Sequence, residues 1–285
     1  MSFTVINTNI NYCGDAHDES LTRMVKLVRS KKVDIIALQE AHTICFQKGR
    51  HFGEELAEKL EANVYSGING TSIVSRHPIH HKQNNGVVID LGKHKVLYKV
   101  VHLTDVPFQP FQIAGVEYGK YPRIKTAEEA ERSSKRSRAK ELEWYLRGTR
   151  TETCTIDEKE YNIDGVLMSG DFNEPSHFDW SEKAAEKKIV AFPVNWYCSK
   201  RLESMGFIDV YRYTHPSELR YPGYTWGVAP YDSWSKGAYE GRIKKERIDF
   251  IYSKRLDIVG CSIIGADEKD WISDHASLIA KFKFV

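Results

Sequence analysis

Short apolar runs alternate along this chain with longer amphipathic stretches, and both kinds of pattern end sharply at polar residues. Runs of about four to eight apolar or β-branched residues predict buried strands, whereas apolar residues three and four positions apart predict helices. In the first half, strands are predicted at Phe3–Asn9, Val33–Leu38, Asn63–Tyr65, Thr71–Ser75, Val87–Leu91 and Lys95–His102, and helices at Glu19–Ser30 and Phe52–Leu60. Because several of these strands follow one another closely, antiparallel pairing is expected.

The second half repeats this mixture. A long helix is predicted from Thr126 to about Leu146, since Glu129 follows Thr126 by three residues in a capping-box pattern. Its middle, Glu128–Arg138, is mostly charged and is expected on the surface. The later predictions are a strand at Asp164–Met168, a helix near Ser199–Met205, and strands at Arg247–Tyr252, Asp257–Ile264 and Ala276–Phe284. Strands and helices in both halves predict an α/β fold of two packed mixed sheets with helices outside.

Composition narrows the class of protein. The 285 residues contain no repeat or linker, which predicts one domain over residues 1–285. A formal charge of +2 argues against a protein that coats long DNA by electrostatics. No signal-peptide pattern and no apolar run long enough to span a bilayer are recognised. The five cysteines are scattered, as is typical of reduced thiols. We therefore expect a cytoplasmic monomer without membrane insertion.

Polar residues gather where apolar runs end. Asp34–Glu40, Lys99–Asp105 and Val166–Asn173 each pass from apolar residues into acids, amides or histidine, and Asp274-His275 comes just before the last strand. The apolar residues of that last strand would suffice for folding, so the presence of the charged pair just before it needs another explanation. Convergent polar groups at strand ends predict a catalytic site.

Glu40 and Asn9 end two of the predicted strands and offer oxygen ligands. A carboxylate in such a place is costly to bury unless it is paired or bound to a cation. Mg²⁺ accepts one or two carboxylates and completes its coordination with waters and substrate oxygens. Taken alone, however, a glutamate at a strand end is more often a solvated loop residue.

Gly170–Asn173 reads as a tight turn after a buried strand. Asp171 and Asn173 are separated by two positions and can therefore point to one side of an extended backbone. The carboxylate could then orient a water while the amide donates to a phosphate oxygen. The same pattern also occurs in ordinary turns.

Asp249 interrupts an apolar strand, and a buried aspartate there needs a partner. His275 is the predicted partner, because a hydrogen bond to its Nδ1 would fix the imidazole tautomer and raise its basicity. A structural hydrogen bond from Asp249 to the backbone is an equal alternative.

Together these residues resemble the endonuclease/exonuclease/phosphatase superfamily, the deoxyribonuclease-I-like phosphoesterases, over nearly the whole chain. The matching motifs are Asn9, Gln39-Glu40, His102, Gly170–Asn173, Thr225-Trp226, Arg247-Ile248-Asp249 and Ser273-Asp274-His275. The resemblance implies a four-layer α/β sandwich and Mg²⁺- or Mn²⁺-dependent hydrolysis of a phosphoester. It assigns the metal to Glu40, assisted by Asn9 and Asp274, and catalysis to His102, Asp171, Asn173, Asp249 and His275. It leaves open whether an aspartate or a histidine is the general base.

Loop residues provide the predicted substrate contacts. Phe108, Phe111 and Trp226 could stack on bases or sugars, although covering a sheet edge is the favoured alternative for Trp226. Arg247 belongs to a basic run that could bind further phosphates, although such runs are usually solvated. The loop Thr104–Pro122 is expected to border the cleft and shape the substrate.

The leading prediction is a metal-dependent phosphodiesterase or nuclease that acts on nucleic acid, a nucleotide or another soluble phosphodiester. A phosphomonoesterase of the inositol-phosphate or lipid-phosphate type is one alternative, and a non-catalytic binding module on the same fold is another. Abasic-site repair is less favoured, because that branch of the superfamily usually carries tyrosine at the position of His102. The complete set of site residues favours an enzyme over a binding module.

Overall fold

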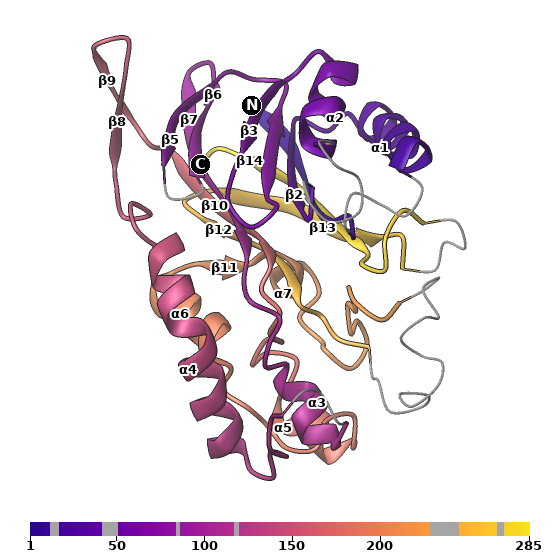
Figure 1. Cartoon of the computed structure of the whole chain (residues 1–285). Coiled ribbons are helices and arrows are strands. Elements are labelled where there is room, and N and C mark those ends of the chain that lie inside the picture. The colour runs from indigo at the N-terminus through magenta and orange to yellow at the C-terminus, as the bar shows by residue number, and fades with distance from the viewer. Residues whose placement is uncertain (12–16, 42–50, 84–85, 117–119, 229–244, 267–270) are drawn as a thin grey trace.

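Two six-stranded sheets form the framework of the computed structural model, which describes residues 1–11, 17–41, 51–83, 86–116, 120–228, 245–266 and 271–285. The first sheet has the order β13 (Asp257–Ile264), β14 (Ser277–Lys283), β1 (Ser2–Asn9), β2 (Ile35–Gln39), β4 (Ser72–Ser75) and β3 (Asn63–Ser66). The second has the order β11 (Ile208–Asp209), β12 (Asp249–Lys254), β10 (Gly165–Asp171), β7 (His94–His102), β6 (Gly86–Leu91) and β5 (Ile79–Gln83). A separate ribbon of β8 (Thr153–Ile156) and β9 (Lys159–Asn162) projects from the body (Figure 1).

Helices cover the outer faces of both sheets. α1 (His17–Lys31) and α2 (Phe52–Leu60) pack on the first sheet, and α4 (Ala127–Tyr145) and α6 (Tyr197–Ser204) on the second. Three short helices, α3 (Gln109–Ala114), α5 (Glu182–Glu186) and α7 (Val210–Thr214), lie in the connections. α3 and α5 are neighbours at the end of the molecule that is lowest in Figure 1.

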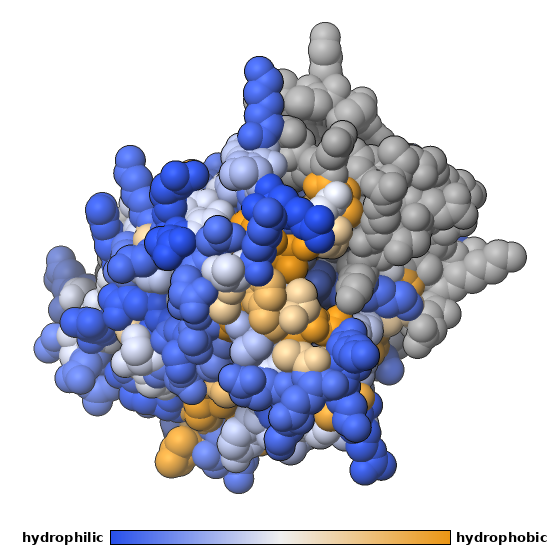
Figure 2. All heavy atoms as spheres, turned by 90° about the horizontal axis from the view of Figure 1, so that it is seen from below, coloured by the Kyte–Doolittle hydropathy of each residue, from blue (hydrophilic) through white to orange (hydrophobic). Residues whose placement is uncertain are grey.

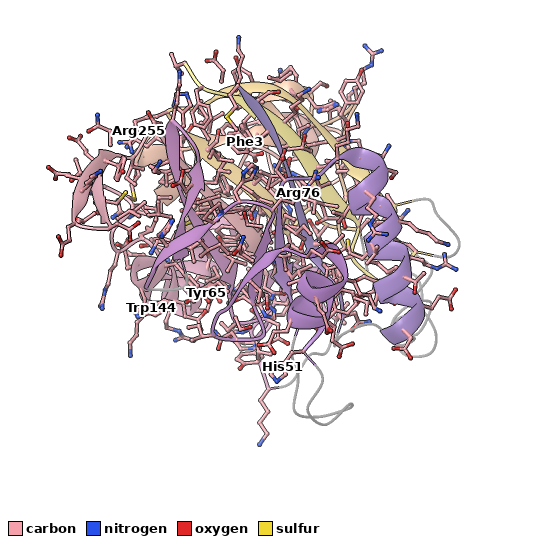
Figure 3. The ribbon with its side chains drawn as sticks, turned by 90° about the horizontal axis from the view of Figure 1, so that it is seen from above. Phe3, His51, Tyr65, Arg76, Trp144 and Arg255 are labelled. Carbon is pink, nitrogen blue, oxygen red and sulfur yellow. The ribbon has the colours of Figure 1, made fainter. Side chains whose placement is uncertain are left out.

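The main hydrophobic core lies between the sheets. Successive side chains of a strand point to opposite faces, so Val5 of β1 packs toward the second sheet whereas Ile6 packs under α1 and α2. Figure 3 looks onto the molecule from above and labels Phe3, which belongs to the core between the sheets. Helix, sheet, sheet and helix thus form four layers, which confirms the predicted fold class.

Most predicted strands and helices are present, with ends that differ by a few residues. α2 and β13 have the predicted bounds. The capping box of α4 is also present, with the Glu129 N–H donating to Thr126 Oγ1 at 3.2 Å. These elements carry strong local signals of apolar period or capping, which explains the agreement.

Several short or polar elements do not follow from the sequence pattern. They are β5, the ribbon β8–β9, β11, α3, α5 and α7. All four residues of β9 are exposed, so this strand has no apolar face from which the sequence could predict it. The expectation that Glu128–Arg138 lies on the surface is only half right, because Ala130, Ser134 and Arg138 are buried. A four-residue spacing places them on the inner face of α4.

Cys154, Cys198 and Cys261 are free thiols, whereas Cys13 and Cys45 lie outside the described residues. Within the described ranges, we find no helix with the length and apolarity needed to cross a membrane.

Candidate active site

Three predicted site residues lie in one row across the second sheet. β10 pairs in parallel with β7 and antiparallel with β12, and these registers place Asp171 opposite both His102 and Asp249. Asp171 is 1% exposed and Asp249 is fully buried, while His102 is half-buried. The carboxyl ends of β7 and β10 and the start of β12 therefore bring an imidazole and two carboxylates together.

The first sheet contributes Asn9 and Glu40. β1 and β2 run parallel with Asn9 opposite Gln39, and Glu40 follows directly with a left-handed φ of 56°. Asn9 Nδ2 donates to Glu40 Oε1 at 2.9 Å and to Asp171 Oδ2 at 3.1 Å. One buried amide thus connects carboxylates from two different sheets.

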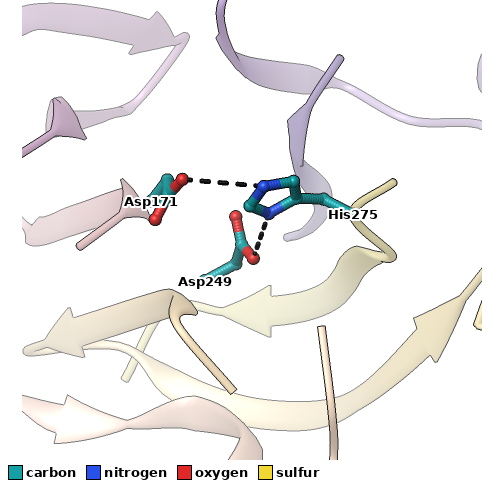
Figure 4. A group of neighbouring side chains, drawn as sticks. All are labelled: Asp171, Asp249 and His275. Atoms are coloured by element: carbon teal, nitrogen blue, oxygen red, sulfur yellow. Dashed lines mark hydrogen bonds and ion pairs between the residues drawn. The ribbon is translucent and has the colours of Figure 1, made fainter. Parts of the chain in front are cut away.

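His275 enters the site from the loop before β14. Its Nδ1 donates to Asp249 Oδ2 at 2.9 Å, which is the hydrogen bond expected from the sequence (Figure 4). Its Nε2 faces Asp171 Oδ2 at 3.9 Å, too far for a hydrogen bond. The His275 N–H donates to Ser273 Oγ at 3.1 Å, and Trp271 Nε1 donates to the His275 carbonyl at 2.7 Å. These bonds fix the orientation of the ring.

The Thr225-Trp226 segment supports both members of this pair. Thr225 Oγ1 accepts a hydrogen bond from the Asp249 N–H at 3.1 Å, and the Thr225 carbonyl accepts one from the Ala276 N–H at 2.7 Å. Trp226 forms an isolated β-bridge with His275. The segment therefore holds β12 and the loop of His275 at a fixed separation.

The electrostatics of the site shift several pKa values. Burial and the neighbouring Asp249 raise the pKa of Asp171 to about 6, although His275 opposes this. Burial disfavours a charged His275, but Asp249, Asp274 and Asp171 outweigh burial and raise the pKa of His275 well above its ordinary value. Burial and Glu40 raise the pKa of Asp274. These carboxylates therefore favour the imidazolium form of His275, in which both ring nitrogens are donors.

The acidic side chains suit a divalent cation. Asp171 and Asp249 each offer a carboxylate oxygen, and these oxygens lie within 4.8 Å of each other and of a His275 ring nitrogen. Asp249 Oδ1 is buried without a hydrogen-bond partner in the described part of the chain. Glu40 lies close enough to Asp274 to raise its pKa. Carboxylate oxygens are the ligands that Mg²⁺ and Mn²⁺ prefer, so this donor set fits such an ion.

Backbone carbonyls hold the two remaining predicted catalytic residues. Asn173 Nδ2 donates to the Leu103 carbonyl at 3.0 Å. His102 Nδ1 donates to the Asn69 carbonyl at 2.9 Å, and His102 Nε2 faces Glu40 Oε1 at 3.9 Å. The imidazole of His102 is thus oriented toward the acidic group, whereas the Asn173 side chain is engaged with the backbone.

The three predicted aromatic contacts form one cluster. The Phe108 and Phe111 ring centroids lie 5.5 and 5.8 Å from that of Trp226. Phe108 and Phe111 are each only 5% exposed, because the loop Thr104–Pro122 contains α3 and packs against the body; residues 117–119 of that loop lie outside the described ranges. The cluster adjoins the site through Trp226. A substrate-binding role for these rings stays a prediction.

Arg247 is not brought to the site. Its guanidinium is 1% exposed and donates to Asp209 from Nη1 at 3.0 Å and from Nη2 at 2.8 Å. Its Nε donates to Asp179 at 2.8 Å. The two carboxylates overcome the effect of burial and raise the pKa of Arg247. Its charge is compensated inside the fold, so this placement gives no support to a phosphate-binding role.

The sequence pattern does not predict the buried Arg138 and Glu174 behind the turn Gly170–Asn173. Arg138 is fully buried, and its Nη2 donates to the Asn173 carbonyl at 2.9 Å and to the Pro107 carbonyl at 3.0 Å. Glu174 accepts a hydrogen bond from the Cys198 N–H at 2.7 Å. The helical spacing of α4 places Arg138 on the buried face of the helix. A charged side chain usually faces solvent, however, so the sequence pattern predicts that Arg138 is exposed.

Gly170 allows β10 to approach β7 closely just before Asp171. Its φ is +154°, and a Cβ here would lie 1.8 Å from the Val101 carbonyl oxygen. Gly170→Ala is therefore expected to lower the free energy of unfolding by about 3 kcal/mol, because backbone must move. Gly92→Ala is the control, since Gly92 also has a positive φ but open space around it. Equal losses in urea denaturation would contradict this account.

A family model that spans most of the chain identifies the family. A model of the endonuclease/exonuclease/phosphatase family matches residues 6–275, and the chain belongs to this family, whose members are hydrolases. An uncharacterised protein of Caenorhabditis elegans is 31% identical over 134 residues, a match that spans 42% of this chain and 41% of that protein.

Solved structures show the same fold. A 3′–5′ exonuclease (NExo) from Neisseria meningitidis is 18% identical, with 99% of this chain and all of that chain covered at a TM-score of 0.58. TDP2 of D. rerio, solved with a single-strand DNA product, is 15% identical, with 99% of each chain covered at a TM-score of 0.55. At these identities the likeness concerns the fold alone.

Proposed function

We propose that this protein is a divalent-metal-dependent phosphodiesterase whose substrate is a nucleic acid, a nucleotide or another soluble phosphodiester. The carrying observation is the Asn9 amide, which donates to Glu40 and Asp171 and so joins the carboxylates of both sheets beside the Asp249–His275 pair. Such concentrated negative charge, next to one imidazolium, is suited to a cation and a phosphate together. The DNA product bound by the related TDP2 supports nucleic acid as the substrate class.

Glu40 would hold the metal, with Asn9 and Asp274 assisting. Mg²⁺ or Mn²⁺ bound there would neutralise charge on the phosphate. Asn9 is suited to the task because its amide already lies between two carboxylates. Its Oδ1 accepts a hydrogen bond from the Asn11 N–H at 3.0 Å, so the amide is held with its Nδ2 toward the carboxylates and would assist by keeping them in place.

The other side chains would act on the phosphate and on the attacking water. Asp249 holds His275 through Nδ1, so the Nε2–H of the imidazolium is able to donate to a phosphate oxygen. Asp171, with a pKa of about 6, is able to orient a water or accept its proton near neutral pH. Asn173 would help to position the scissile group by holding the turn after β10. His102, whose Nδ1–H is engaged by the Asn69 carbonyl, would donate to the leaving or non-bridging oxygen from Nε2 in its imidazolium form.

The test is a substrate panel assayed with Mg²⁺, with Mn²⁺ and with EDTA. It should contain single- and double-stranded DNA, RNA, abasic DNA, cyclic dinucleotides, inositol phosphates, sphingomyelin and bis-p-nitrophenyl phosphate. We expect hydrolysis of a diester that EDTA abolishes and that Glu40→Ala reduces by about 10³-fold or more. Glu54→Ala, which removes an acid from α2 outside the site, is the matched control and should keep full activity.

The outcomes separate the alternatives. Cleavage of monoesters alone would replace the proposal by a phosphomonoesterase. Metal-dependent binding of a phosphoester without turnover would indicate a binding module. Undiminished diester hydrolysis by Glu40→Ala would contradict the proposed metal site.

A further inference from the structure

The connection between β3 and β4 contains a tight turn that contacts the candidate active site. Asn69 and Gly70 both have positive φ, 52° and 71°, and the Thr71 N–H donates to the Ile68 carbonyl at 3.1 Å. Two successive positive φ angles closed by this hydrogen bond are those of a type I′ turn, for which Asn-Gly is strongly preferred. The two residues themselves therefore specify the shape of the turn.

The carbonyls of these two residues hold groups that belong to different sheets. The Asn69 carbonyl accepts the hydrogen bond from His102 Nδ1 at 2.9 Å, at the end of β7. The Gly70 carbonyl accepts one from the Ala41 N–H at 2.6 Å, and Ala41 directly follows Glu40. One short piece of backbone thus joins the chain that carries the proposed metal ligand to the imidazole of the second sheet.

Tyr145 of α4 adds a second connection between the turn and His102. Its hydroxyl donates to the His102 carbonyl at 3.3 Å and is hydrogen-bonded with the Asn69 side chain. Burial raises the pKa of Tyr145 to about 12, so the hydroxyl keeps its proton near neutral pH. Both the ring and the backbone of His102 are therefore held relative to the turn.

The carbonyl acceptor determines which nitrogen of His102 carries the proton. A carbonyl oxygen can only accept, so Nδ1 is the donor, and Nε2 is the nitrogen that faces Glu40 Oε1 at 3.9 Å. Without this carbonyl, either nitrogen of the neutral ring could carry the proton and the ring could rotate. The turn therefore restricts both the tautomer and the direction of the imidazole.

The side chains that the turn holds in place are open to solvent. Those of His102 and Glu40 are 20% and 18% exposed. Residues 103–108 lead from β7 to α3, which lies at the end of the molecule seen in Figure 2. On that face, hydrophilic side chains surround an apolar patch, so a charged ester can approach without crossing a continuous apolar surface.

We propose that the Asn69-Gly70 turn is a positioning element of the active site, which directs His102 Nε2 toward the phosphate and sets its separation from Glu40. This role rests on the proposed function, although the state of the ring does not depend on substrate. Because the turn acts through His102 and contacts no reacting atom, its disruption should lower kcat and leave KM nearly unchanged.

The ring is tested first, without catalysis. Long-range ¹H–¹⁵N spectra of the ¹⁵N-labelled protein distinguish the Nδ1–H form of a neutral histidine from the Nε2–H form, and His102→Gln assigns the signals of His102. We expect the Nδ1–H form in the parent protein at a pH where the ring is neutral. An Nε2–H form there would overturn the proposal, whatever the variants do.

Asn69→Val then tests the turn itself. A β-branched residue is a poor fit to positive φ, so the turn should change shape and move its carbonyl away from His102. The neutral ring should then become a mixture of both forms, and kcat should fall by about 10- to 100-fold. Asn69→Gly should restore both readings, because glycine adopts positive φ readily, even though it lacks the side chain that reaches Tyr145.

The ribbon β8–β9 provides the matched control. Its exposed turn, Asp157-Glu158, also has two positive φ angles, 49° and 63°. Asp157→Val introduces the same backbone strain at the same turn position, and it should change neither the His102 signals nor kcat.

Two results would contradict the role of the turn. They are unchanged His102 signals in Asn69→Val, and equal losses of kcat in Asn69→Val and Asn69→Gly. Absence of diester hydrolysis in the parent protein would instead refute the proposed function, while the spectra still decide whether the turn holds the ring.

Discussion

His275→Ala is expected to lower kcat/KM for diester hydrolysis by about 10²- to 10⁴-fold while the protein stays folded. The imidazole is the side chain that faces both Asp249 and Asp171, and its Nε2 is free of a hydrogen bond to either carboxylate in the described structure. Removing it leaves two carboxylates without their cation, so binding of an anionic substrate should weaken as well. His80→Ala, on the outer strand β5, is the matched control and should retain activity.

Asp249→Asn tests how His275 acts. Asp249 is the strongest of the carboxylates that raise the pKa of His275, so its loss should bring that pKa back toward the ordinary range. If the imidazolium is the active form, the variant should lose activity at neutral pH and regain part of it as the pH falls below the new pKa. A pH–rate profile that merely drops by a constant factor would count against an imidazolium role and favour a purely positional one.

Arg247→Met is expected to destabilise the protein by about 3–5 kcal/mol, since it removes the guanidinium that pairs with the buried Asp209 and leaves Asp179 paired with Arg212. Three hydrogen bonds join the guanidinium to these acids, and its plane also lies over the Phe250 ring at 4.5 Å. Arg201→Met is the matched control, because the Arg201–Glu143 pair is short at 2.6 Å but lies on the surface, with side chains 30% and 44% exposed. Such a pair contributes about 0–1 kcal/mol.

Urea denaturation of both variants measures these losses. Kinetics of Arg247→Met at low temperature, where the folded population is largest, should show an unchanged KM. A raised KM with unchanged stability would restore the phosphate-binding role predicted for this arginine from the sequence.

The helices and strands that the sequence predicts are those whose signal lies within their own residues. Apolar runs predict β1, β2 and β7, and a capping box predicts the start of α4. The ribbon β8–β9 has neither signal, because β9 is exposed along its whole length. Its strands are defined by pairing with each other, and that depends on a turn whose residues are common in loops.

The site shows the same division between local and distant causes. Strand-end polarity indicates Asp171 and His102, and their alignment follows from strand register. The burial of Arg247 depends instead on Asp209 and Asp179, which lie 38 and 68 residues away along the chain. The sequence pattern of one segment cannot reveal partners so far away. The charge of Arg247 therefore predicts either a solvent-exposed side chain or a phosphate-binding one.

The Asn9 amide has a consequence for how the protein would fail. Its two acceptors belong to different sheets, so their distance from each other is set by the apolar layer between those sheets and by no single loop. A slip of one sheet over the other by even a fraction of a side-chain width would pull Glu40 away from Asp171 while leaving every strand intact. The proposed hydrolysis would then be lost before the secondary structure is, so an activity assay would report how the two sheets are positioned relative to each other.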